Sequence, residues 1–399
     1  MKKTFLWLAC VLLTASACTN ATKRCAQEAQ PEIPILAWYS IPAGEFATQE
    51  RYEELRDAGF TFSFSHIYNY DDAIKALDLC AATGLKSIFT CPELEKEPEA
   101  TVEKVKNHPG LGGYFLRDEP GNDAMDALGE WARRIESVDS LHPCYLNLLP
   151  SFVFSHDGYI EHLRLFNEKV NLPQISYDHY PIHQTEEGVR LSPAFFENLE
   201  LVAQSARETG KPFWAFALAT AHTPYPIPTL AHLRLQLYAD LCYGAQCLQY
   251  FTYWNPGTET WNFHEAPIKQ DGKRSPVYEL VRQMNREIQA RAFVFKDSEV
   301  ESVRHMGAEI PQSTTRLESL PEHFKTLTSG DSGALVSQLK NGENHYVVVQ
   351  NTSPNDPIEL QIETDEAVEM IRPDGSRVPA HLYGPLFILE AGNILVFAN

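Results

Sequence analysis

Short apolar runs alternate with amphipathic stretches throughout residues 33–296. Runs that are apolar on nearly every residue are typical of parallel strands that helices cover. The stretches between them carry apolar residues at helical spacing, and several end at a glycine, as at Gly59, Gly84, Gly210 and Gly244. Glycine commonly ends a helix because it adopts the left-handed conformation without strain. The pattern therefore predicts a regular succession of strands and helices.

Eight strand–helix units follow one another in this region. The predicted strands are 35–41, 60–68, 86–91, 113–117, 144–149, 174–180, 212–218 and 247–254, and the predicted helices are 48–57, 71–84, 95–107, 123–137, 157–168, 193–209, 229–243 and 276–292. This number and order are typical of a (β/α)8 TIM barrel. A doubly wound open sheet is the alternative, although the glycine-rich phosphate fingerprint that often marks one is absent after the first strand.

The pattern changes after residue 296 to short strands separated by turn residues. Examples are 334–339, 346–350, 358–362, 386–389 and 394–397, with turns at 340–343 and 373–375. Such spacing predicts a small antiparallel β-sandwich. We therefore expect a barrel domain over 33–296 and a C-terminal β-sandwich over 297–399.

The first 32 residues predict export rather than a folded element. A basic start precedes an apolar run over 5–13 that is too short to span a bilayer, and small residues follow it. We interpret 1–17 as a signal peptide and 18–32 as a polar tether. The small residues before Cys18 resemble a bacterial lipobox, in which Cys18 would be lipidated, whereas cleavage after Ala17 would give a secreted protein. We expect a cell-envelope lipoprotein.

Composition limits the partners of the chain. The 399 residues include 33 Lys and Arg against 53 Asp and Glu, a formal charge of -20. Such an acidic surface repels phosphate backbones, which argues against nucleic-acid binding, whereas a neutral oligo- or polysaccharide is compatible with it. The cysteines at 80, 91, 144, 242 and 247 are widely spaced, so we interpret them as buried thiols. No spacing indicates a metal site, and we expect neither a metal nor another cofactor.

The fourth predicted strand runs directly into Arg117-Asp118-Glu119-Pro120. Proline ends the strand because it cannot donate to the sheet. The carboxyl groups should therefore lie at the C-terminal mouth of the barrel, where catalytic residues of such barrels gather. Glu119 is our candidate for a general acid, because glycoside hydrolysis needs one protonated carboxyl group beside the leaving oxygen. A structural ion-pair cluster with Arg117 is the alternative.

The order of exported leader, barrel, strand-four acid and terminal sandwich resembles clan A glycoside hydrolases. It is most similar to uncharacterised glycosidase lipoproteins of gut-type bacteria with Asp-Glu-Pro at this strand. The resemblance implies that Glu119 is the acid/base and that Asp118 replaces the usual asparagine. The family places its nucleophilic glutamate at the end of strand seven, but 213–220 contains no carboxylate. The family mechanism therefore does not transfer whole.

The best substitute for the missing carboxylate is Asp178, which ends the sixth predicted strand. We expect it to act as base or nucleophile opposite Glu119. A separation of about 6.5–9.5 Å would indicate an inverting reaction and about 5–5.5 Å a retaining one. The alternative is that Asp178 only orients His179 or binds a sugar hydroxyl group. Glu259 and Glu265, after strand eight, are reserve carboxylates.

Two further readings stay open. Adjacent Asp118 and Glu119 resemble the pair of substrate-assisted hexosaminidases, in which the acetamido group of the substrate attacks and Tyr180 or Tyr253 would hold its oxygen. The missing carboxylate on strand seven is also compatible with an inactive glycan-binding protein of the cell envelope. The sugar and the linkage are not predicted.

Aromatic and polar residues at the predicted strand ends are candidates for substrate binding. Sugar rings stack their apolar faces on aromatic side chains, and we prefer Trp254 and Trp261 as platforms. Arg117 and Asp118 would tune and orient the catalytic groups. The other candidates for substrate contact are Tyr39, Tyr68, Asn147, His179, Tyr180 and Tyr253.

Overall fold

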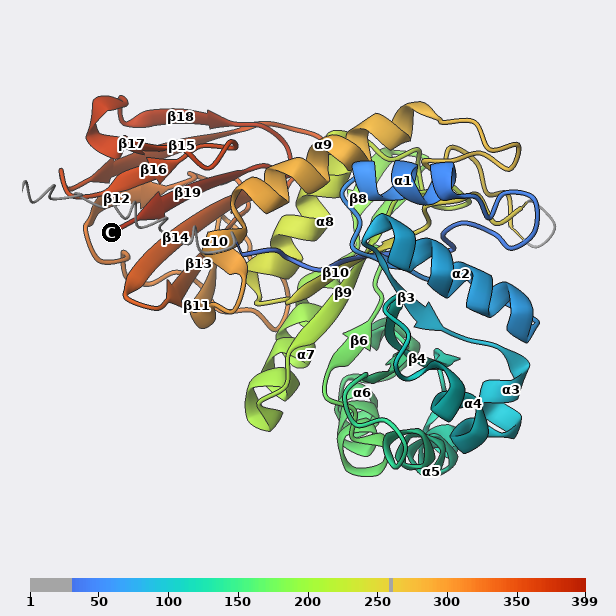
Figure 1. Cartoon of the computed structure of the whole chain (residues 1–399). Helices are drawn as coiled ribbons and strands as arrows, with labels where there is room; N and C mark the ends of the chain where they lie inside the picture. The colour runs from blue at the N-terminus through green and yellow to red at the C-terminus, as the bar shows by residue number, and fades with distance from the viewer. Residues whose placement is uncertain (1–30, 258–260) are drawn as a thin grey trace, which may run out of the picture. The chain divides into compact units, whose positions relative to one another are not determined.

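The computed structural model describes residues 31–257 and 261–399. Eight parallel strands form one sheet in the order β5-β4-β3-β2-β1-β10-β9-β6 (Figure 1). A parallel bridge between Leu148 and Tyr177 joins its two ends, and the backbone N–H of Leu148 donates to the carbonyl oxygen of Ser176 at 2.8 Å. The sheet is thus a closed TIM barrel, as predicted, and not an open doubly wound sheet. Its strands are β1 (Ile35–Trp38), β2 (Phe62–Ser63), β3 (Lys86–Phe89), β4 (Leu111–Asp118), β5 (Cys144–Asn147), β6 (Ile175–Tyr177), β9 (Phe213–Leu218) and β10 (Cys247–Phe251).

Helices follow the barrel strands nearly as the sequence predicts. They are α1 (Gln49–Asp57), α2 (Tyr70–Thr83), α3 (Pro92–Lys96), α4 (Pro98–Val105), α5 (Met125–Glu136), α6 (His156–Leu165), α7 (Phe195–Thr209), α8 (Leu230–Cys242), α9 (Pro276–Ala290) and α10 (Ala292–Phe295), with short turns η1 (Asn122–Ala124), η2 (Ser151–Val153), η3 (Phe166–Val170) and η4 (Ala380–Leu382). The predicted helix 95–107 is two helices, because Pro98 starts a new one. Helix α2 begins one residue early because Asn69 caps it by accepting from the Asp72 N–H.

One barrel element escaped prediction. The hairpin of β7 (Ile182–Thr185) and β8 (Gly188–Leu191) interrupts the expected passage from β6 to α7. Its backbone is joined to the loop after β9, since Gln184 N–H donates to the carbonyl oxygen of Pro224 at 2.7 Å. The hairpin is therefore attached to the loop after β9.

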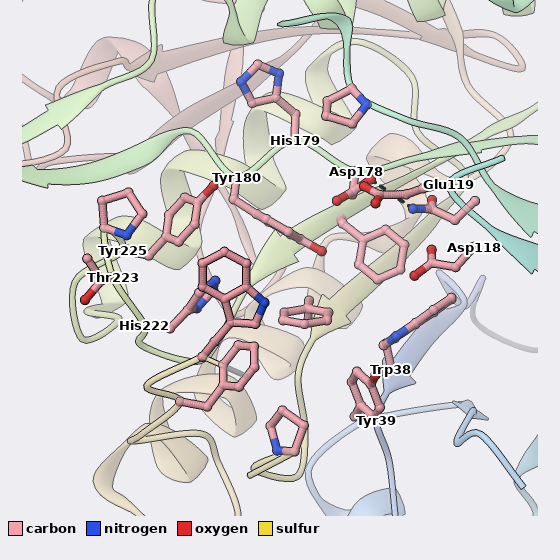
Figure 2. A pocket seen from close by; sticks show the side chains of 18 of the residues that line it. Trp38, Tyr39, Asp118, Glu119, Asp178, His179, Tyr180, His222, Thr223 and Tyr225 are labelled. Carbon is pink, nitrogen blue, oxygen red and sulfur yellow. Dashed lines mark hydrogen bonds between the residues drawn. The ribbon is translucent and has the colours of Figure 1, made fainter. Parts of the chain in front are cut away.

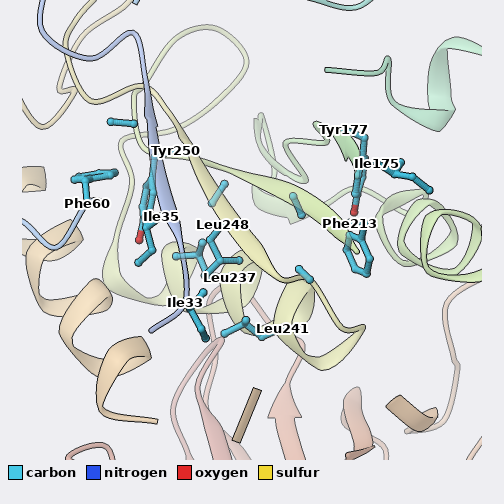
Figure 3. Close-up of a cluster of buried hydrophobic side chains, with 14 of the residues drawn as sticks. Ile33, Ile35, Phe60, Ile175, Tyr177, Phe213, Leu237, Leu241, Leu248 and Tyr250 are labelled. Carbon is cyan, nitrogen blue, oxygen red and sulfur yellow. The ribbon is translucent and has the colours of Figure 1, made fainter. Parts of the chain in front are cut away.

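Two apolar layers hold the barrel together. Inside it, Trp38, Phe64, Phe115 and Phe216 pack with other buried side chains. Outside it, strand residues such as Leu248 pack against helices such as α8 (Figure 3). The five described cysteines, Cys80, Cys91, Cys144, Cys242 and Cys247, are buried and unbridged, as predicted.

The C-terminal region is a β-sandwich of two antiparallel sheets, which confirms the predicted fold class. A six-stranded sheet has the order β11-β13-β14-β19-β16-β17 and faces the sheet β12-β15-β18. Ser337 Oγ donates to the carbonyl oxygen of Cys242 at 2.7 Å, and Gln350 Nε2 to that of Leu235 at 3.0 Å. These bonds attach the larger sheet to helix α8. The strands are β11 (Glu299–Met306), β12 (Phe324–Thr328), β13 (Ala334–Asn341), β14 (Asn344–Asn351), β15 (Ile358–Thr364), β16 (Glu369–Ile371), β17 (Arg377–Pro379), β18 (Leu386–Leu389) and β19 (Ile394–Ala398).

Candidate active site

A cavity of about 750 Å³ lies at the C-terminal ends of the barrel strands. Residues at or just after strands β1, β4, β5, β6, β9 and β10 line it (Figure 2). Its volume falls in the range of small-molecule sites, about 300–1,000 Å³. Eight predicted site residues line this cavity: Tyr39, Asp118, Glu119, Asn147, Asp178, His179, Tyr180 and Trp261.

A bulge at the end of β4 sets which acidic side chains reach the cavity. Phe115 pairs with Tyr145 of β5, whereas Asp118 pairs with Asn147, so β4 has one residue more than its neighbour over this stretch. Bulges re-aim side chains in this way beside active sites. Glu119 follows with a φ of 44°, a left-handed conformation that costs energy for a residue other than glycine.

Glu119 and Asp178 meet inside the cavity. Figure 2 shows their carboxyl groups turned toward one another, and a hydrogen bond between them raises the pKa of Asp178 and lowers that of Glu119. Burial is the largest cause for both, so the pKa of Glu119 is raised overall and that of Asp178 lies well above its usual range. Two touching carboxylates resist full ionisation. The contact therefore favours protonation of the pair more than either carboxyl group alone would.

This contact changes the geometry that we expected from the sequence. Two carboxyl groups that share a hydrogen bond leave no room for a sugar ring or a water between the bonded oxygens. The role of Asp178 as base or nucleophile stays a prediction.

Asp118 is a third carboxyl group in the cavity. Burial and the charge of Glu119 raise its pKa to about 7, although the amide of Asn147 opposes the rise. The side chains of Asp118 and Glu119 are open to the cavity. The surrounding walls nevertheless limit the hydration of their charged forms, which raises both pKa values. Among the described residues, no lysine or arginine lines the cavity, and this lack of cations explains why the carboxyl groups hold protons.

Asn147 and His179 support the acidic cluster. Asn147 Nδ2 donates to Asp178 Oδ1 at 2.9 Å. The His179 ring contacts Asn198 Oδ1 at 3.0 Å and Ser192 Oγ at 3.3 Å. Burial lowers the pKa of His179 to about 4, so its ring is neutral at physiological pH. His179 therefore lines the cavity as a neutral ring that Asn198 and Ser192 hold in place, and it supplies no positive charge beside Asp178.

Aromatic side chains form much of the remaining wall. Tyr180 packs against Phe251 and Tyr225, with ring centroids 5.5 and 6.0 Å apart. Trp261 lines the cavity with 56% of its surface exposed, so its ring is available for stacking. Tyr39 lies on the side of Asp118, whose charge, after burial, raises the pKa of the Tyr39 hydroxyl.

Two predicted binding residues lie outside the cavity. Arg117 is exposed and does not line it, because the bulge gives the inward position to Asp118. The described ion pairs include none between Arg117 and a neighbouring carboxylate, so the alternative of an ion-pair cluster is also unsupported. Tyr68 is 81% exposed beside the cap of α2, since β2 ends at Ser63 and the chain turns away before Tyr68.

Tyr253 and Trp254 also differ from the prediction. They are only 1% and 4% exposed and do not line the cavity. Beyond β10 the chain continues alongside β1, and the two side chains pack outside the barrel, Tyr253 on Phe60 and Trp254 on Phe46. Neither is available as a stacking platform, which leaves Trp261 of the two that we preferred.

Several lining residues were not predicted. Phe152 follows β5 and is 58% exposed, and His222 and Tyr225 lie in the loop after β9. The sequence 222–226, His-Thr-Pro-Tyr-Pro, marks a loop at the mouth of the barrel, and its position after a predicted strand was a usable signal. Phe152 follows a predicted strand just as closely, so the same signal was available for it.

Neither reserve carboxylate, Glu259 or Glu265, is among the described residues that line the cavity. Glu265 lies 3.8 Å from Lys269 Nζ and does not line the cavity, and Glu259 falls outside the described residues. Strand β9 brings no carboxylate to the site. Within the described chain, no group of three His, Cys, Asp or Glu is arranged to hold a metal ion, and no helix is long and apolar enough to cross a membrane.

Comparison with known families gives one match. The sequence family described as Beta-galactosidase matches residues 135–291. This range is under half of the chain; it includes Asp178 but not Asp118 or Glu119. No curated protein matches the sequence.

Solved structures share the fold over most of the chain. A β-galactosidase from Bacillus circulans sp. alkalophilus aligns with a TM-score of 0.59 at 9% identity, over 93% of this chain and 99% of that enzyme. A glycoside hydrolase family 5 protein from Bacteroides vulgatus gives 0.58 at 14% identity, over 92% and 89%. The chain resembles clan A glycoside hydrolases. A β-galactosidase from Marinomonas ef1 gives 0.50 at 11% identity over 65% of this chain, and the match spans only 60% of that enzyme's length.

Proposed function

We propose that the protein is a glycoside hydrolase and that Glu119 donates the proton to the departing sugar oxygen. The observation that carries this proposal is the meeting of Glu119, Asp178 and Asp118 in one cavity at the mouth of a TIM barrel. A carboxyl group that stays protonated near neutral pH is what general acid catalysis requires. The Beta-galactosidase family match and the shared fold support the same reaction class.

The carboxyl groups divide the work. Glu119 is the partner open to the cavity, so it presents the proton to the glycosidic oxygen as the bond to the anomeric carbon breaks. Asp118, with a pKa of about 7, is partly ionised and faces the same space. Its carboxylate stabilises the positive charge that develops on the sugar ring. The water that attacks the anomeric carbon returns a proton to the Glu119–Asp178 pair, which restores the starting state.

A substrate-assisted mechanism is a second candidate for the same site. Strand β9 supplies no carboxylate that could act as the nucleophile, and Asp118 directly precedes Glu119 in the sequence. If the 2-acetamido group of the substrate attacks instead, Asp118 orients that group and Tyr180, which lines the cavity, holds its oxygen. Turnover restricted to 2-acetamido sugars would favour this mechanism.

The test is release of aglycone from a panel of aryl glycosides and of reducing sugar from oligosaccharides. Wild type is compared with Glu119→Gln, Asp118→Asn and Asp178→Asn. Glu265→Gln is the matched control, because it removes a carboxylate near the barrel mouth that does not line the cavity. We expect the three cavity variants to lose activity and the control to retain it. Glycan binding without turnover by wild type would instead indicate the non-catalytic envelope protein.

We also propose that the protein is exported and anchored through lipid on Cys18. The support is the leader pattern alone. Incorporation of labelled fatty acid into wild type but not into Cys18→Ala would agree with it. Release of both into the medium without label would contradict it.

A further inference from the structure

Behind the cavity, four side chains form a continuous line of hydrogen bonds inside the barrel. Tyr145 donates from its hydroxyl to Gln249 Oε1 at 2.6 Å, and Gln249 Nε2 donates to Ser176 Oγ at 2.9 Å. Ser176 Oγ donates to Asn147 Oδ1 at 3.0 Å, and Asn147 Nδ2 donates to Asp178 Oδ1 at 2.9 Å. We call these four residues the buried relay. None is more than 3% exposed, and only Asn147 lines the cavity.

The chemistry of each group gives the relay a direction. An amide oxygen only accepts and an amide nitrogen only donates. Once the Tyr145 hydroxyl points at Gln249 Oε1, the nitrogen of that amide must face Ser176. The single proton of Ser176 then goes to Asn147, 3.0 Å away, in preference to the more distant Tyr145 oxygen at 3.4 Å. Every donor in the line therefore points toward Asp178.

This direction favours one place for the shared proton. Asp178 Oδ1 receives the Asn147 N–H and must be an acceptor. Because an unprotonated carboxyl oxygen is the stronger acceptor, the Asn147 N–H favours a proton on the other oxygen of Asp178, where it meets Glu119. We propose that the buried relay is a positioning device that keeps the shared proton between Asp178 and Glu119.

Other ionisable groups also lie near Glu119 and Asp178 and affect the pKa values of this pair. Asp118 lies on β4, and the five tyrosines Tyr145, Tyr159, Tyr177, Tyr180 and Tyr225 approach from β5, α6, β6 and the loops after β6 and β9. The buried tyrosines keep their protons, since burial raises the pKa of each. With His179 neutral, the amide of Asn147 is the main donor that stabilises negative charge on Asp178.

Two substitutions interrupt the relay without touching a carboxyl group. Ser176→Ala removes the donor that fixes Asn147, and Tyr145→Phe removes the first donor. Tyr250→Phe is the matched control, because Tyr250 is equally buried on β10 and its hydroxyl also donates to an amide oxygen, Asn285 Oδ1, at 2.7 Å. The control loses the same kind of bond outside the relay.

The readout is the pH dependence of kcat/KM, which rests on the proposed function, together with that of the urea-unfolding free energy, which needs no substrate. A weaker donor to Asp178 raises the pKa of the pair. We expect the alkaline limb of the activity profile, which reports loss of the shared proton, to move to higher pH, by roughly 0.5–1 unit in Ser176→Ala and less in Tyr145→Phe. The pH at which unfolding free energy stops falling should move with it, even if no glycoside is cleaved.

Either of two results would overturn the inference. If both variants lose stability like Tyr250→Phe and their pH midpoints stay in place, the relay is only structural. If the midpoints move to lower pH, the Asn147 amide is oriented the other way. Shifted unfolding midpoints in a protein that cleaves no substrate would support the relay and count against the proposed function alone.

Discussion

Two of the places where this molecule partly or wholly buries carboxyl groups differ, because only one of them provides positively charged partners. Glu287 on α9 lies 2.6 Å from Arg234 and 3.9 Å from Arg291. Burial would raise the pKa of Glu287, but hydrogen bonds from Arg234 and Gln283 and the charges of both arginines lower it overall. Glu119 and Asp178 at the barrel mouth face another carboxyl group instead, and their pKa values rise.

Under the proposed function, the difference separates a structural role from a chemical one. A paired carboxylate holds α8 and α9 together and has no proton to give. Unpaired carboxyl groups destabilise the fold, and such clusters persist mainly where the reaction uses them. Four substitutions test this contrast, from the largest expected effect to the smallest.

Glu119→Gln should give the largest effect. The amide cannot donate an acidic proton, so we expect kcat/KM to fall by roughly 10²- to 10⁴-fold. The unfolding free energy should stay unchanged or rise, because an uncompensated carboxyl group has been removed. Steady-state kinetics and urea unfolding on the same preparation measure both. Retained activity would break the assignment of Glu119 as the acid.

Glu287→Gln should give the reverse result. Arg291 is 1% exposed and would lose its anionic partner, which should lower the unfolding free energy by roughly 2–4 kcal/mol at neutral pH. In wild type this contribution is present above the unfolded pKa of a glutamate and is lost as pH falls through the lower folded value. Activity per folded molecule should not change. Equal losses of activity in Glu287→Gln and Glu119→Gln would erase the contrast.

Asp178→Asn should make the protein more stable while impairing catalysis. A carboxyl group with a raised folded pKa favours folding at low pH, and this contribution is lost as pH rises through the folded value. Wild-type stability should therefore decline from about pH 4 upward, and the variant should decline less. We expect a gain of roughly 0.5–2 kcal/mol at pH 7. Urea unfolding across pH 4–8 measures it, and a variant less stable than wild type at pH 7 would contradict it.

Trp261→Ala should give the smallest effect. Loss of a stacking ring costs about 0.5–1.5 kcal/mol, which corresponds to a KM increase of roughly 2- to 10-fold with little change in kcat. Tyr68→Ala is the control, since Tyr68 is exposed but lies away from the cavity. Equal effects on KM from both substitutions would exclude specific stacking on Trp261.

The sequence predicted the parts that follow from repeating patterns. Apolar runs and glycine stops located the barrel strands, and the proline after Glu119 placed the acidic residues at the mouth. Strand ends depend on register and were less predictable. The one-residue bulge in β4 turns Asp118, and not Arg117, toward the cavity. The path of the chain beyond β10 buries Trp254.

Distances between strand ends were not predictable either. The sequence identified Glu119 and Asp178, but their direct contact depends on barrel closure between β5 and β6. The buried relay was missed for a related reason. Gln249 and Ser176 lie 73 positions apart and become neighbours only when the strands surround a common interior.

Helix α8 has almost no face of its own toward water. Its buried residues include Leu233, Leu235, Leu237 and Leu241, because strands of the barrel and of the sandwich enclose it. A premature stop codon after residue 296 would uncover this apolar helix and produce a sticky, aggregating barrel. We therefore expect a barrel expressed without the sandwich to aggregate or to be degraded.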